Sequence, residues 1–362
     1  MDNAEKGIKL LFSNGNHIGD TFSYSSNILF YGDSSSFQIV RIASIFDLIT
    51  FSTYSATSVL FAVVSFVGMW LFFLTFYKIS PHLHFPIAVA SLFIPSVVFW
   101  GSGIFKDTIT LAALGLVTYT FHHLLVERKF TFKGIVLLLF GLVMIFSIKK
   151  YVLLSFLPAL LIWFFASNLF RIKSTILRTL LIPMTMVSVF WLGYFAVLKV
   201  GEDDPRYKLS QLSQTVKITA YDIRYGWGAR LGEGSGYTLG ELDGTWQSMI
   251  KLAPRAINVS LFRPYFWEAS NPLMLFSAFE GFILFIITVF VLIRGRNKLL
   301  RHLVKPEIIF CLTFAIIFAF AVGVSTFNFG TLSRYKIPMM PFFLIGLILL
   351  YDSKKHNANQ HM

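Results

Sequence analysis

Nine apolar runs divide the sequence and constrain its fold more than any other feature. A helix needs about 20 apolar residues to cross the roughly 30 Å of hydrocarbon in a bilayer. Because lipid offers no hydrogen-bond partners to an open backbone, each crossing segment should be helical. Six of the runs are long enough, and three are shorter or interrupted by proline. The long runs are 57–77, 108–126, 151–170, 179–199, 272–293 and 307–326, and the others are 85–100, 134–147 and 335–351.

The composition agrees with a membrane protein, since 56% of the 362 residues are hydrophobic and only 14% are charged. A soluble domain has roughly a quarter of its residues charged. The single cysteine, Cys311, excludes a disulfide within the chain. We find no metal-ligand spacing and no glycine-rich phosphate loop after a strand, so no metal ligands are expected and no cofactor is firmly predicted, while a divalent cation is possible. The sequence therefore predicts an all-α integral membrane protein with about nine transmembrane helices.

The net charge of +13 is spread over short connections between the apolar runs. A nucleic-acid site would need these cations on one soluble face, so nucleic acid is not an expected partner. If the first run passes inward, about fourteen Lys and Arg lie on inward connections and five on short outward ones. This bias predicts a multi-pass protein of the cytoplasmic (inner) membrane with a cytoplasmic C-terminus. The expected regions are an extracytoplasmic amphipathic segment 1–56, a first bundle of about six spans 57–199, an extracytoplasmic loop 200–271, three last spans 272–351 and a cytoplasmic tail 352–362.

The segment before the first long run has no signal peptide, because "MDNAEKGIKLLF" lacks a continuous apolar core. The stretches "GIKLLFSN" and "SNILFYG" predict short amphipathic pieces that lie on the membrane surface. Either the 57–77 helix carries its own N-terminus across the membrane, or an upstream helix is missing. The sequence favours the second alternative, an N-terminal truncation. The long connection 200–271 is too polar for lipid and is expected to form short helices or a lid.

Four outward-facing clusters place cations beside aromatic residues or prolines at the ends of apolar runs. Each member has an ordinary structural explanation. Asp107 fits a helix N-cap, and single Lys or Arg side chains near helix ends often extend to lipid headgroups. Tyr265 and Trp267 fit an aromatic belt. The candidate binding residues in these clusters are Lys106, Asp107, Lys149, Lys150, Arg263, Glu268, Arg334, Tyr335 and Lys336.

Taken together, the clusters favour a binding site for an anionic lipid headgroup. A phosphate or pyrophosphate on a lipid tail needs fixed cations beside an apolar groove, and arginine binds phosphate oxygens with two nitrogens at once. We expect Arg334 and Lys336 to face such a headgroup at the outer surface. Pro338 and Pro341 should bend the helix there and leave a groove.

The chain resembles the multi-pass GT-C type glycosyltransferases and related envelope-polysaccharide membrane proteins of bacteria. The resemblance covers most of residues 57–351 and rests on "PSVVFWGSGIFKDTITLAALG", "LFRPYFWEASNP" and "NFGTLSRYKIPMMPFFL". It implies transfer of a sugar from a polyprenyl-phosphate lipid donor to an envelope glycan or lipid acceptor at the outer face of the membrane. In such enzymes a carboxylate is the general base for the acceptor hydroxyl, and basic residues stabilise the departing lipid phosphate.

The family places its catalytic acid in the first outer loop, after a first helix that this chain lacks. Asp33 and Asp20 are the candidates that remain in the N-terminal segment, although Asp-Ser-Ser at 33–35 is also an ordinary turn. A polymerase-like protein for O-antigen or exopolysaccharide is an alternative, because it also uses outer arginines and a large outer loop. A lipid-linked oligosaccharide transporter is a third, for which Glu280 is the one acid well inside a run. The expected partners are a polyprenyl-phosphate lipid and membrane lipids.

Overall fold

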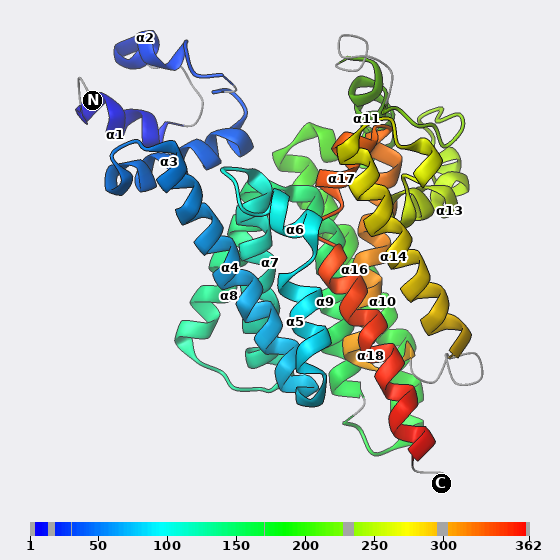
Figure 1. The fold of residues 1–362 in the computed structure, drawn as a ribbon. Coiled ribbons are helices and arrows are strands. Elements are labelled where there is room, and N and C mark those ends of the chain that lie inside the picture. Colours follow the sequence, from blue (N-terminus) through cyan, green and yellow to red (C-terminus); the bar gives the residue numbers. More distant parts are fainter. Residues whose placement is uncertain are drawn as a thin grey trace.

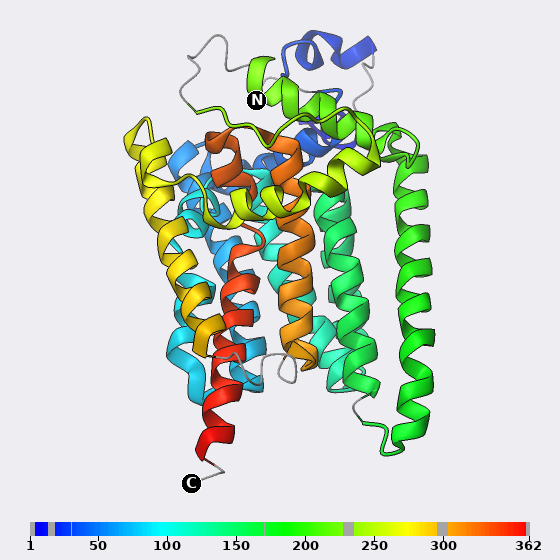
Figure 2. The same ribbon diagram turned by 90° about the vertical axis from the view of Figure 1, so that its right-hand side faces the viewer.

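The computed structural model describes residues 4–13, 19–29, 31–169, 171–226, 235–294 and 303–359. Within these ranges the chain is helical throughout and contains no strand; the nearest approach to one is an isolated antiparallel bridge between Gly236 and Asn328. The expectation of an all-α protein is thus confirmed. The long helices stand side by side along one common direction and form a bundle, and shorter helices lie across its end (Figures 1 and 2).

Six helices of the described chain are long and apolar enough to cross a membrane. They coincide with the six long apolar runs, so the architecture is that of a multi-pass membrane protein. They are α4 (Tyr54–Ile79), α7 (Lys106–Phe121) with its π-helical extension η3 (His122–Val126), α9 (Lys150–Leu169), α10 (Thr175–Asp203), α14 (Pro272–Arg294) and α16 (Pro306–Thr326).

The other three runs form shorter or broken helices. By length and composition, six helices of the described chain could cross a membrane, or seven if a bent pair counts as one span, and the expected total of about nine spans stays a prediction. Helices α17 (Phe329–Tyr335) and α18 (Met340–Asn359) are that pair, with a bend of 64°. The run 85–100 divides into α5 (His84–Leu92) and α6 (Pro95–Trp100). Proline disfavours helical backbone in the residue before it, and Ile94 is accordingly extended. Helix α8 (Phe132–Ile148) has only 17 residues.

The two ends of the bundle differ in structure. We call the end that carries α3, α6, α11, α13 and α17 the upper end, as it lies in Figures 1 and 2, and the end where α18 finishes the lower end. The connection 200–271 lies at the upper end and contains short helices, as expected. The remaining elements are α1 (Ala4–Phe12), η1 (Gly19–Thr21), α2 (Phe22–Ser25), α3 (Ser34–Thr50), η2 (Pro81–Leu83), η4 (Pro205–Tyr207), α11 (Leu212–Tyr221), η5 (Asp222–Gly226), α13 (Trp246–Phe262) and η6 (Phe266–Glu268).

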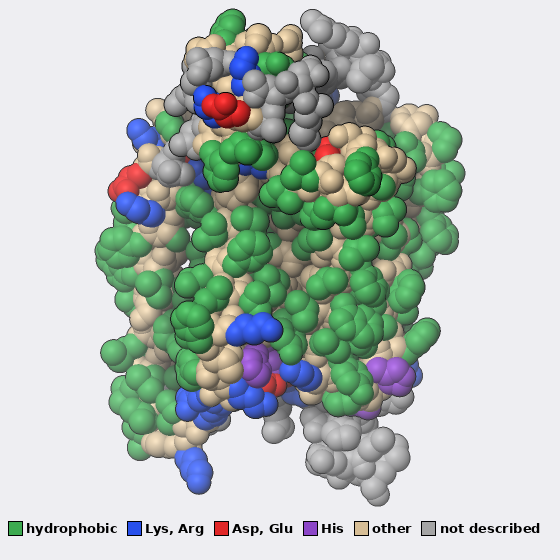
Figure 3. Space-filling model, turned by 90° about the vertical axis from the view of Figure 1, so that its left-hand side faces the viewer, with side chains coloured by type: hydrophobic (Ala, Val, Ile, Leu, Met, Phe, Trp, Pro, Cys, Tyr) green, Lys and Arg blue, Asp and Glu red, His purple; other side chains and the backbone are tan. Residues whose placement is uncertain are grey.

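Basic side chains gather at the lower end on the face shown in Figure 3, next to histidines. Several of them tie the connections at this end together. Arg128 donates to the Asn168 side chain, Arg171 donates to the Val126 carbonyl, and Lys78 lies 4.7 Å from the ring centre of Tyr119. These described cations of the inward connections therefore lie at one end of the bundle.

Aromatic side chains pack helices α9, α16 and α18 against one another. Trp163 of α9 stacks on Phe310 of α16 with ring centres 4.2 Å apart, and Phe314 of α16 meets Phe342 of α18 edge to face at 4.6 Å. All four side chains are buried. Because α16 leads into α17 through a left-handed residue, Phe327, this core determines where α17 and its polar residues lie.

Helices α4 and α10 show two extremes of packing. Helix α4 lies so close to α7 that a Cβ atom built on Gly115 would overlap the carbonyl group of Gly68. Small residues allow such close helix contacts in membranes. In contrast, no residue in the most apolar 18-residue stretch of α10 is buried, and this helix packs chiefly against α9. Figure 2 shows α10 at the right-hand edge of the bundle.

Candidate functional site

A buried carboxylate at the upper end joins three distant parts of the chain. Asp107, in the first turn of α7, is fully buried. Its Oδ1 accepts a hydrogen bond from Lys149 Nζ, and its Oδ2 accepts one from Arg334 Nε at 2.6 Å. Removing such charges from water costs several kcal/mol per ion, so they persist only as a well-bonded group. The structure therefore brings together three of the residues that the sequence placed in separate clusters.

Each member of this triad comes from the end of a helix. Lys149 is the residue between α8 and α9, and Arg334 is in the last turn of α17. Asp107 carries a negative charge in the first turn of α7, where the helix dipole favours it. The expectation that Asp107 is the N-cap of its helix was wrong: the N-cap position is Phe105, and no side chain caps it. The helix begins at Lys106, so Asp107 is its second residue, and the carboxylate oxygens bind Lys149 and Arg334 instead.

Arg334 has unused hydrogen-bonding capacity. Nε binds Asp107, whereas no described residue accepts a hydrogen bond from Nη1 or Nη2. The guanidinium lies 4.6 Å from the ring centre of Phe105 and 5.7 Å from that of Trp100, and the side chain is 31% exposed. Asp107 thus orients the guanidinium of Arg334 through Nε, and the two terminal nitrogens are left to bind another anion.

Lys149 lies deeper than Arg334 and is only 6% exposed. Its ammonium group is 5.3 Å from the ring centre of Tyr335 and 5.8 Å from that of Tyr151. Aromatic faces stabilise a cation by about 0.5–2 kcal/mol, more when water is excluded. Tyr335 thus contributes to the candidate site by holding Lys149 against Asp107.

A second carboxylate, Asp33, binds the neighbouring cation. It is the N-cap of α3 and accepts hydrogen bonds from Ser35 N, Ser35 Oγ and Ser36 Oγ. Lys106 Nζ lies 3.2 Å from Asp33 Oδ2 and 2.7 Å from Ser35 Oγ. Burial alone would raise the pKa of Asp33, but the hydrogen bonds from Ser36 and Ser35 and the charge of Lys106 hold the pKa well below its ordinary value. The ion pair ties the N-terminal segment to the start of α7.

A third carboxylate, Asp204, was not singled out in the sequence. It accepts hydrogen bonds from the backbone and the side chain of Arg206, among them one from Nε to Oδ1 at 3.0 Å and one from Nη2 to Oδ2 at 2.8 Å. Lys150 Nζ lies 3.9 Å from the same Oδ2. The hydrogen bond from Arg206 lowers the pKa of Asp204 against the opposing effect of burial. In the sequence, the polar stretch "EDDPR" directly after an apolar run indicates the end of a helix. It does not indicate which residues Asp204 binds.

We group these residues as the upper cluster, because Lys106 is near enough to both Lys149 and Arg206 for their positive charges to repel its own. Five of them were expected to bind a headgroup from three outer turns: Lys106 and Asp107 from the first, Lys149 and Lys150 from the second, and Arg334 from the third. The upper cluster comprises Lys106, Lys149, Lys150, Arg206, Arg334, Asp33, Asp107 and Asp204.

Arg263 and Glu268, two further candidates, pair with each other. Arg263 Nε lies 3.0 Å from Glu268 Oε2, and a second nitrogen binds Oε1. The guanidinium also lies over the rings of Tyr237 at 5.6 Å and Phe329 at 5.3 Å. Glu268 accepts a further hydrogen bond from Tyr265 N at 2.8 Å. Arg263 and Glu268 therefore stabilise the turn before α14. Their ion pair is separate from those of the upper cluster.

The turn around Glu268 should lose stability in acid. Burial raises the pKa of Glu268, but the hydrogen bonds from Arg263 and Tyr265 outweigh it and leave the pKa below its ordinary value. A carboxylate with a lowered folded-state pKa contributes stability above its unfolded pKa and loses it as the pH falls. We expect the melting temperature of the wild type to fall more between pH 7 and pH 3.5 than that of Glu268→Gln. Equal falls in the two proteins would show that this pair does not contribute.

Lys336 differs from its expected position. It was expected to face outward beside Arg334, but it is 1% exposed and its Nζ has no hydrogen-bond partner among the described residues. The turn between α17 and α18 directs it inward, toward Glu280 of α14. Glu280 in turn accepts hydrogen bonds from Ser96 N at 2.9 Å and Ser96 Oγ at 2.7 Å. Glu280, on which the transporter alternative rested, therefore braces the start of α6.

The two remaining expectations concern Asp20 and a metal. Asp20 lies in η1, but its side chain is outside the part of the chain that the structure describes. In the described ranges no group of three or more His, Cys, Asp or Glu side chains is arranged to hold a metal ion. The described residues therefore offer a divalent cation no preformed set of protein ligands.

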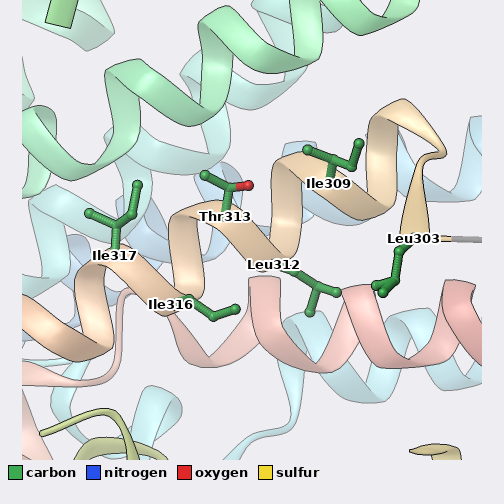
Figure 4. Close-up of a pocket in the computed structure, with 6 residues that line it drawn as sticks. All are labelled: Leu303, Ile309, Leu312, Thr313, Ile316 and Ile317. Carbon is green, nitrogen blue, oxygen red and sulfur yellow. The ribbon is translucent and has the colours of Figure 1, made fainter. Parts of the chain in front are cut away.

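Two hollows lie outside the upper cluster. One, of about 360 Å³, follows α16 and is shown in Figure 4. Its lining has one hydroxyl and is otherwise aliphatic, so it fits a hydrocarbon chain and not a sugar. The second, of about 190 Å³, is lined in part by Ser65, Ser91 and Ser102. Residues Leu303, Ile309, Leu312, Thr313, Ile316 and Ile317 line the first.

Comparison of the chain with models of known protein families, with characterised proteins and with solved structures finds no significant match. The chemistry of the upper cluster is therefore the basis for a functional assignment.

Proposed function

We propose that the upper cluster binds the phosphate of a polyprenyl-linked sugar and that the protein transfers this sugar to an envelope glycan or lipid acceptor. The observation that carries the proposal is the geometry of Arg334. Its Nε is fixed by a fully buried Asp107, while Nη1 and Nη2 have no acceptor in the described structure. An arginine held in this way is ready to bind two phosphate oxygens without further ordering.

Glycosyl transfer from such a donor breaks the bond between the sugar C1 and a phosphate oxygen, and forms a bond from C1 to the acceptor oxygen. The bonding electrons leave with the phosphate, where negative charge develops. Fixed cations at that point stabilise the transition state more than the bound substrate. Arg334 and Lys106, both partly exposed, are suited to this role.

The proton of the acceptor hydroxyl must pass to a base. Asp33 and Asp20 remain the proposed candidates. Asp33 lies within the upper cluster, next to Lys106. Its lowered pKa makes it a weak base, so it would accept the proton in the transition state, as the acceptor oxygen bonds to C1 and the hydroxyl becomes more acidic. Asp33→Asn is therefore expected to lower the turnover number more than the affinity for the donor. Measuring both quantities separates the role of Asp33 as a base from a role in phosphate binding.

The proposed orientation puts the upper cluster on the extracytoplasmic side of the cytoplasmic membrane. It follows the positive-inside rule, because basic side chains of the described inward connections gather at the lower end. The C-terminus is then cytoplasmic, and the donor occupies the outer leaflet. A polymerase-like activity uses the same contact with a lipid-linked phosphate and differs in the acceptor.

The proposal is tested by replacing Arg334 with glutamine. Loss of a charged bidentate contact removes about 1.5–3 kcal/mol, which corresponds to at least about a tenfold loss of affinity. The measurement is binding and transfer of a short-chain prenyl-phosphate sugar by the purified protein in detergent. Arg294→Gln, at the lower end of α14, is the control and should behave as wild type. Wild-type binding and transfer by a folded Arg334→Gln variant would refute the assignment.

A further inference from the structure

The lower end of the bundle carries an irregular turn. Helix α7 continues into the π-helical η3, and the chain reverses at Arg128, whose backbone is left-handed with φ at 61°. The backbone N of Lys129 then donates to the His123 carbonyl at 3.0 Å, which folds Lys129 back beside η3. π-Helical turns and left-handed residues other than glycine are found often at functional sites. This turn is therefore a second candidate site, at the end opposite the upper cluster.

A series of direct contacts joins two lysines across this turn. Glu127 Oε2 lies 3.1 Å from Lys129 Nζ and 3.3 Å from His123 Nδ1. The ring of His123 stacks on that of Tyr119, with ring centres 6.3 Å apart. Lys78, near the end of α4, donates to the Tyr119 hydroxyl at 3.3 Å and lies over the Tyr119 ring. Lys78 and Lys129 therefore lie on either side of the same few side chains.

The two lysines and Tyr119 have hydrogen-bond donors left for an anion. Both lysines are exposed, and the charges of both act on the adjacent His122. Lys78 has no carboxylate within ion-pair distance in the described ranges, and its hydrogen bond goes to the neutral Tyr119. The Tyr119 hydroxyl accepts this bond and donates to no described acceptor. Ammonium and phenol groups are donors that bind phosphate oxygens well.

The chain directly after the turn indicates that these donors lie at the membrane surface. Phe130 and Phe132 are 67% and 83% exposed, and they alternate with Lys129 and the exposed Lys133 in the stretch "KFTFK". Exposed aromatic rings are unfavourable in water and are enriched where a membrane meets water. Lysine side chains at that level extend to lipid headgroups. The surface therefore favours a phospholipid over a soluble anion.

We infer that the lower end binds the phosphate of an anionic phospholipid between Lys78 and Lys129. One phosphate oxygen would accept hydrogen bonds from Lys78 and the Tyr119 hydroxyl and another from Lys129, while Glu127 holds Lys129 in place. Basic side chains gather at this end of the molecule, next to histidines (Figure 3), and basic pockets between helices bind lipid headgroups. In the proposed orientation the lipid belongs to the inner leaflet. The site lies opposite the upper cluster, so it does not depend on the proposed function.

The test titrates the purified protein in a non-ionic detergent with phosphatidylglycerol or with phosphatidylcholine of the same acyl chains, and native mass spectrometry counts the bound lipid. The wild type is expected to bind phosphatidylglycerol at least about fivefold more tightly. Lys78→Gln and, separately, Lys129→Gln should each lower this affinity about fivefold, which corresponds to about 1 kcal/mol. Tyr119→Phe keeps the charge but removes a donor, and it should lower the affinity at least about twofold. Equal wild-type affinities for the two lipids, or an unchanged affinity in either lysine variant, would overturn the inference.

Matched controls separate this site from bulk charge, from the upper cluster and from a soluble ligand. Arg294→Gln removes one positive charge from the lower end of α14 and should keep the wild-type affinity for the first bound phosphatidylglycerol. A loss there as large as in Lys78→Gln would show bulk attraction and overturn the inference. A larger loss in Arg334→Gln than in Lys78→Gln would place the lipid at the upper cluster instead. Glycerol phosphate, which has no acyl chains, should bind weakly, and binding as tight as that of phosphatidylglycerol would replace the lipid by a soluble phosphate.

Discussion

Replacing Asp107 with asparagine is expected to destabilise the protein by about 3–5 kcal/mol. The carboxylate is fully buried and is bonded to both Lys149 and Arg334, and asparagine leaves Lys149 as a buried cation without a counter-charge. The free energy of unfolding is measured by titrating the detergent-solubilised protein with a denaturing detergent. A variant that unfolds at the same point as wild type would show that the triad does not stabilise the fold.

A double substitution separates the lost charge from the lost packing. Asp107→Asn combined with Lys149→Met removes both members of the buried pair and retains an unbranched apolar chain at residue 149. Replacing a buried ion pair by apolar groups is often neutral in stability, so the double variant should be more stable than Asp107→Asn alone. The difference gives the coupling energy of the pair. Strictly additive effects would contradict the ion pair.

A second large effect is expected from adding one methyl group between α4 and α7. Gly115→Ala would place a Cβ atom on the carbonyl group of Gly68, and backbone cannot rotate away as a flexible side chain can. Overpacking of this kind typically costs about 1–3 kcal/mol, and the helices must separate to relieve it. Helix α7 carries Lys106 and Asp107, so the same change should also weaken donor binding.

Gly193→Ala provides the matched control. This glycine lies in α10, and a Cβ atom there meets nothing within 4 Å. The same substitution should therefore stabilise the protein by roughly 0.5–1 kcal/mol, since alanine loses less backbone freedom in a helix. Both melting temperatures are measured in the same detergent. If Gly115→Ala is as stable as Gly193→Ala, α4 and α7 do not pack this closely.

The sequence identified the long spans because hydropathy and length determine whether a helix can cross a membrane. The shorter runs are harder to interpret because local backbone chemistry intervenes, as at Ile94 before Pro95, where the chain is extended between two short helices. Hydropathy also gives no indication of packing. Helices α10 and α16 both contain an apolar stretch long enough to cross a membrane, yet no residue of that stretch is buried in α10, whereas α16 contributes many residues to the core.

The site could be predicted in part. The cations at outer turns were visible as separate local patterns, but their convergence on Asp107 depends on pairing between residues more than 200 positions apart, such as Asp107 and Arg334. Lys336 lies only two residues from Arg334, and the bend after α17 sends the two side chains in different directions. Arg206 was missed because its importance comes from Asp204 and the neighbouring cations, not from its own sequence context.

The buried ammonium group of Lys336 has a consequence for how the protein is made. A lysine that enters the bilayer alone is costly, whereas one that meets a carboxylate is not. Glu280, the carboxylate whose charge acts on Lys336, belongs to α14 and is synthesised before α17 and α18. A permuted protein that began with α17 and α18 would bring Lys336 to the membrane before Glu280, and we expect that protein to insert less efficiently.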